Sequence, residues 1–70
     1  MLFEKFRMKQ RFRSEMHEIV REKENLVKTE IKALMAESDP EKARHHAAMM
    51  QEYARQAAIA KQMRDMKIDF

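Results

Sequence analysis

The chain has 70 residues, of which 39% are charged, with a formal net charge of +3 and neither cysteine nor glycine. A chain of this length forms at most one small domain, and the lack of cysteine excludes a disulfide and a cysteine-based zinc site. The sequence contains no apolar run long enough to span a membrane, and its first residues are too charged for the apolar core of a signal peptide. We therefore expect a soluble, cytoplasmic protein.

The first thirteen residues mix basic and aromatic side chains. Residues 1–13 carry five basic residues against one acidic residue, and their apolar side chains point to several sides of a helix. One interpretation is the end of a bundle helix whose lysines extend into solvent. Another is an electrostatic contact with nucleic-acid phosphates, and a third is binding to a membrane surface or an acidic protein. The candidates for nucleic-acid binding are Arg7, Lys9, Arg11 and Arg13.

The stretch 14–37 has the pattern of an amphipathic helix. Its apolar residues recur at intervals of three and four, which places them on one broad arc. Lys23 and Glu30 interrupt this arc, either to fix the register of a bundle or because they lie at the edge of the seam; we favour the edge. The residues of the arc are Met16, Ile19, Val20, Leu26, Val27, Ile31, Leu34 and Met35.

A break in the helical pattern follows at residues 37–41. Pro40 is the only proline, and it cannot sit inside a helix without losing a hydrogen bond and clashing one turn back. At the first turn of a helix the same residue costs little. Asp39 is the expected N-cap, and Ser38 with Glu41 forms an alternative capping box. A single kinked helix is the competing interpretation to two separate helices.

The second helix is apolar on different sides in its two halves. Its first half places four alanines, a histidine, a methionine and a tyrosine on one face, where small side chains allow two helices to approach closely. Its second half is apolar on roughly the opposite side, which predicts two different neighbours: the first helix of the same chain, and then another polypeptide. The first face comprises Ala43, His46, Ala47, Met50, Tyr53, Ala54 and Ala57, and the second comprises Ile59, Met63, Met66 and Phe70.

These elements predict an all-α fold in one domain, residues 1–70. We expect one helix over about 2–37, a turn at 38–39 and a second helix over about 40–67, packed as an antiparallel hairpin. A single seam between two helices buries little apolar surface, so we expect the hairpin to dimerise into a four-helix bundle.

Catalytic chemistry has no support in the sequence. His45 and His46 point about 100° apart on a helix and we expect them to face solvent, and Glu41 with His45 is only a weak metal signal. The carboxylates Glu15, Glu18 and Glu22 form a row that we expect to be solvated. Phosphate-cradling loops need glycine. We therefore expect a protein that is not an enzyme and that has no catalytic residues, no metal site and no cofactor.

Three functions fit these expectations. The first is a small regulator that binds a larger protein and inhibits it through an apolar helical face, for which the candidate residues are Ile59, Met63, Met66, Phe70, Leu2, Phe3 and Phe6. The second is nucleic-acid binding through the basic segment, and the third is a structural subunit of a larger assembly. In size and expected architecture the chain is similar to the small helical-hairpin dimers that plasmids and phages encode as regulators.

Overall fold

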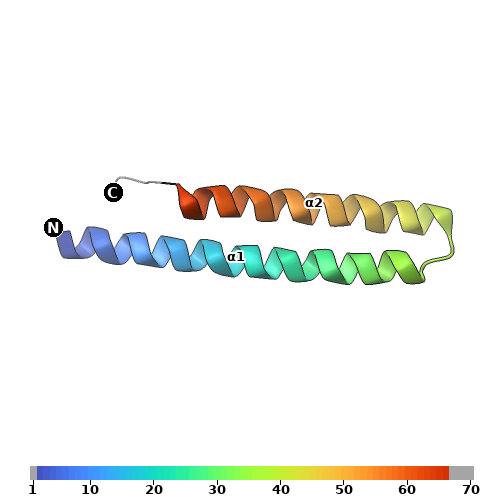
Figure 1. The fold of residues 1–70 in the computed structure, drawn as a ribbon, viewed down its shortest axis with the longest axis horizontal. Coiled ribbons are helices and arrows are strands. Elements are labelled where there is room, and N and C mark those ends of the chain that lie inside the picture. Colours follow the sequence, from blue (N-terminus) through green and yellow to red (C-terminus); the bar gives the residue numbers. More distant parts are fainter. Residues whose placement is uncertain (1, 67–70) are drawn as a thin grey trace.

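The protein forms two long helices that run antiparallel, side by side (Figure 1). The structure is a computed structural model, and it describes residues 2–66. Helix α1 spans Leu2–Ala36 and helix α2 spans Pro40–Asp65. The prediction of an all-helical hairpin is therefore confirmed, and the alternative of one kinked helix is wrong.

The chain reverses within three residues between the helices, and side-chain hydrogen bonds hold this turn. The Oδ1 atom of Asp39 accepts a hydrogen bond from the backbone N–H of Glu41 at 3.0 Å, and the Asp39 backbone is extended (φ −79°, ψ 121°). The Asp39 N–H donates to Oε1 of Glu37 at 3.1 Å. Asp39 is thus the N-cap of α2 and Pro40 its first helical residue, where the missing N–H costs nothing.

The seam between α1 and α2 has a thin apolar core. Among the described residues only Val20, Ala57 and Ala60 are fully buried. Around them lie side chains that are half-buried: Phe12, Met16, Ile19, Leu26, Leu34, Met50 and Tyr53. Two alanines among three core residues bring the helices close together, but they contribute little apolar area.

The structure corrects three sequence-based placements. Ile31 and Met35, which we expected on the core arc, are 39% and 83% exposed. Met35 points away from α2 and Ile31 lies at one flank of the seam, because the real seam covers a narrower arc. Ala54, expected on the inner face of α2, is exposed, since it follows the seam residue Tyr53 and is rotated by about 100° from it.

The hairpin is elongated, and α1 extends beyond the end of α2. The molecule measures 57 × 14 × 11 Å, and its radius of gyration is 16.5 Å, against about 11 Å for a compact domain of this length. Figure 1 shows the N-terminal turns of α1 standing free of α2. We call this part, residues 2–11, the arm. Within residues 2–66 the arm packs against no other helix, and its side chains are exposed.

The Asp39 cap predicts a stability effect with a matched control. Asp39→Ala removes the acceptor for the Glu41 N–H, and we expect it to lower the free energy of unfolding by about 1 kcal/mol. Ser38→Ala, one residue earlier, should change it by much less, because Asp39 provides the cap. Urea denaturation followed by circular dichroism measures both. Equal losses for the two variants would contradict the assignment.

Candidate protein-binding surfaces

Polar contacts join the two helices along their seam. Nδ1 of His46 lies 2.6 Å from Oε2 of Glu30, and both side chains are partly buried. The Nζ atom of Lys23 lies 5.6 Å from the centre of the Tyr53 ring, a cation–π geometry. His46 thus lies on the inner face of α2, as its spacing predicted, and the expectation that it faces solvent is wrong; His45 is exposed. The polar residues that interrupt the apolar arc of α1 contact α2 and contribute to its register.

A second interhelical ion pair lies on one side of the seam. Nζ of Lys61 is 3.0 Å from Oε1 of Glu24, and this hydrogen bond, together with the positive charge of Lys61, lowers the pKa of Glu24 below its ordinary value of 4.5. Both side chains are about half exposed, so solvent screens the interaction.

A shallow apolar groove lies on the same side of the hairpin as this ion pair. Its walls are formed by Glu24, Val27, Lys28, Ala54, Ala57, Ala58 and Lys61. We call this side of the hairpin the groove side. The groove was not predicted from the sequence, although Ala54 and Ala58, small residues four positions apart on one side of α2, are a signal for it.

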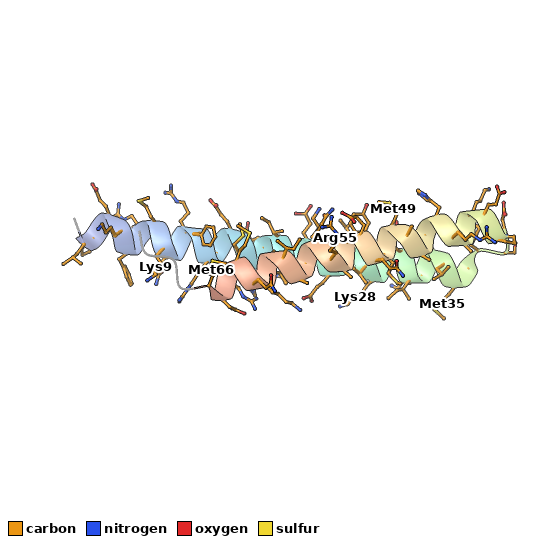
Figure 2. All side chains as sticks on the ribbon, turned by 90° about the horizontal axis from the view of Figure 1, so that it is seen from above. Lys9, Lys28, Met35, Met49, Arg55 and Met66 are labelled. Carbon is orange, nitrogen blue, oxygen red and sulfur yellow. The ribbon has the colours of Figure 1, made fainter. Side chains whose placement is uncertain are left out.

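The arm carries large apolar side chains together with basic ones. Leu2 is 88% exposed and Phe3 is 77% exposed, and Phe6 and Met8 are also exposed. The basic side chains of the first helical turns are exposed too, at Lys5, Arg7, Lys9, Arg11 and Arg13. Figure 2 shows Lys9 on the part of α1 that lies beyond Met66 and the end of α2.

A separate apolar patch lies on the last turns of α2. Ile59, Met63 and Met66 are all exposed, and we call them the α2 patch. At about 100° per residue, Ile59 lies about 200° from the buried Ala57 and Met66 about 240° from the buried Ala60. Helix α2 nevertheless keeps its contact with α1 in this region, so the patch adds a second apolar side to α2 and does not replace the first. Phe70 lies outside the described residues.

Helix geometry separates the arm from the α2 patch. Counted from the seam at about 100° per residue, Leu2, Phe3 and Phe6 project toward the groove side, whereas Ile59, Met63 and Met66 project away from it. The sequence predicted one candidate surface from these six residues. They lie at the same end of the hairpin but on opposite sides of it.

The described residues offer no grouped ligands for a metal ion. Within residues 2–66, no three histidine, aspartate or glutamate side chains are gathered closely enough to hold one. Over the same residues, neither helix is long and apolar enough to cross a membrane. Comparison of the sequence and fold with protein-family models, curated proteins and solved structures found no significant match.

The Glu24–Lys61 pair predicts a pH dependence. Because the folded state lowers the pKa of Glu24, the pair contributes stability above pH 4.5 and loses that contribution as the pH falls through the lowered value. Glu24→Gln should therefore lower the melting temperature slightly at pH 7, and this difference should disappear near pH 3. Glu22→Gln, on another side of the same helix, is the control. A difference that grew on acidification would contradict the pairing.

Proposed function

We propose that the protein is a homodimeric, non-enzymatic regulator that binds a larger protein through the α2 patch and inhibits it. The observation that carries the proposal is the exposure of Ile59, Met63 and Met66 as one patch on the side of α2 that projects away from the groove side. Apolar side chains at spacings of four and three residues form a ridge that fits an apolar groove of another protein. Methionine suits such a contact because its flexible thioether adapts to the partner's surface.

The surface area of the single chain supports the dimer. One chain exposes 6016 Å², whereas a compact protein of 8.5 kDa exposes about 4,700 Å². The excess is therefore roughly 1,300 Å² per chain, and two chains that bury it would form an interface of about 2,600 Å², within the range of obligate homodimers. Dimerisation would thus supply the apolar burial that the thin seam lacks.

Two hollows on residues 2–66 suit binding better than chemistry. One is the shallow groove and another lies on the arm between Glu4 and Arg11. Both are open to solvent and neither holds a nucleophile beside a base, which is the arrangement that covalent catalysis needs.

Substitution of the α2 patch tests the proposal. Met63→Asp with Met66→Asp places two charges in the proposed contact, and we expect it to abolish recovery of the partner in affinity purification and its inhibition in a purified assay. The matched control is His45→Asp with Ala48→Asp. These exposed positions have the same spacing and lie on the same side of α2, five turns away. Recovery that survives the first pair, or that is lost equally with the control, would contradict the proposal.

The arm supports nucleic-acid binding as a second candidate function. Its basic side chains are exposed on a helix end that extends past the last described turn of α2, and a dimer would carry two such arms. Phosphate binding by these residues would show a steep dependence on salt.

A titration with DNA and RNA tests this second function. If it holds, binding measured by fluorescence anisotropy in 50 mM salt should weaken at least tenfold in 200 mM salt. Arg7→Gln with Arg11→Gln should weaken it further, whereas Arg44→Gln with Arg55→Gln, on α2, should have little effect. No complex at micromolar protein in low salt would exclude it.

A further inference from the structure

Helix α1 carries a second heptad stripe beside the one that faces α2. The residues at the centre of the contact with α2 recur at 12, 16, 19, 23, 26, 30 and 33. Each is followed by a residue of the second stripe, whose Val20 is itself buried against α2. This one-residue offset turns the second stripe by about 100° toward the groove side, which is close to the angle between neighbouring faces of a four-helix bundle. The second stripe consists of Phe3, Phe6, Gln10, Arg13, His17, Val20, Glu24, Val27, Ile31 and Leu34.

The order of residues in this stripe is self-complementary when two copies run antiparallel. With the symmetry axis between residues 18 and 19, Phe6 of one copy meets Ile31 of the other, and Arg13 meets Glu24. Phe3 also meets Leu34, and Gln10 meets Val27. At the centre His17, which lies 3.4 Å from Arg64 of its own chain, comes level with Val20, which is already buried against α2. Aromatic residues thus meet aliphatic ones, and the charged positions meet as opposite charges. A parallel arrangement would instead place Arg13 beside Arg13 and Glu24 beside Glu24, which is unfavourable.

If this register is shifted by one heptad in either direction, the pairing of the stripe residues becomes less favourable. One shift pairs Arg13 with Ile31 and the other pairs Phe6 with Glu24, so each places a charge against an apolar side chain. A buried charge without a partner is costly. The register centred between residues 18 and 19 is therefore the one that uses both the charges and the apolar residues of the stripe.

Near the symmetry axis, helix α2 has small side chains that would let α2 of a second copy pack close to it. Extending the cross-seam contacts Glu30–His46 and Lys23–Tyr53 along both helices places Ala58 level with Glu18, beside the symmetry axis. Ala54 and Ala58 line the groove on this side. Their small side chains leave room for α2 of the second copy to pack against α2.

We propose that the occupant of the groove side is a second copy of this chain, bound antiparallel through the second stripe of α1 with Arg13 of each copy beside Glu24 of the other. Glu24 then lies between Lys61 of its own chain and Arg13 of its neighbour. The side chains of Phe3, Phe6 and Ile31, which are exposed in one chain, are covered in the dimer. This arrangement leaves the α2 patch free on the outer surface. It deepens the proposed function, because it rests on the dimer and specifies its interface.

Disulfide crosslinking tests the register, since the chain has no cysteine of its own. Phe6→Cys and Ile31→Cys proteins are mixed, unfolded, refolded together and oxidised, and the products are separated on a non-reducing gel. We expect a covalent dimer from the mixture, at least fivefold above either variant alone. The control is Met8→Cys mixed with Ile31→Cys, because Met8 lies about 200° from Phe6 on the same arm. Strong crosslinking of Phe6→Cys alone, or of the control mixture, would overturn the antiparallel register.

Charge reversal gives a second measurement that does not depend on the cysteine variants. Arg13→Glu would place a carboxylate beside Glu24 twice in each dimer, and we expect it to raise the dimer dissociation constant about tenfold. Arg11→Glu makes the same change of charge on another side of α1 and should raise it less than threefold. Sedimentation equilibrium measures both. Equal effects of the two reversals would overturn the Arg13–Glu24 contact.

The mass of the unsubstituted protein separates the two proposals. Light scattering that shows a single-chain mass at 100 µM would overturn both this interface and the dimer in the proposed function. A dimeric mass without the Phe6–Ile31 crosslink would overturn this interface alone. Neither result affects the test of the α2 patch, which measures binding of a different protein.

Discussion

The reversal at Asp39–Pro40 is the constraint on which the rest of the structure depends. In a chain without glycine the proline is the strongest helix breaker, and Asp39 caps the helix that follows it. Without this break, the pattern of residues 2–65 would predict one long helix with no second helix beside it. The position of the break sets the lengths of the two helices, so that among the described residues α1 extends beyond α2 at the far end of the hairpin (Figure 1).

The hairpin that results has a seam that is specific but thin. Small residues at Ala57 and Ala60 bring the helices together, and the polar contacts of Glu30 and Lys23 with α2 favour one register. These contacts specify how the two helices align, but they bury little apolar surface. It also explains why so many large apolar side chains stay on the outside, where they form two surfaces on opposite sides of the hairpin.

Much of the fold could be predicted from the sequence, because it depends on local signals. The proline, its aspartate cap and the apolar periodicity of 14–37 indicated two helices. It was harder to predict which residues of each helix face the other helix and which face solvent. Met35 follows the apolar spacing as well as Leu34 does, and only the angle at which α2 docks shows that Met35 points into solvent (Figure 2). The periodicity placed His46 on the inner face of α2, but its contact with Glu30 could not be predicted, since Glu30 lies on the other helix. The separation of the arm from the α2 patch likewise depends on the antiparallel docking of both helices.

The location of Tyr53 gives this protein a built-in optical reporter. The chain has one tyrosine and no tryptophan. Fluorescence excited in the tyrosine absorption band therefore comes from one position. That position lies on the seam beneath Lys23. Emission from Tyr53 therefore follows the parting of the helices, whereas circular dichroism follows the loss of helix itself. Recording both signals in one denaturation experiment distinguishes a hairpin that opens as two intact helices from one that melts in a single step.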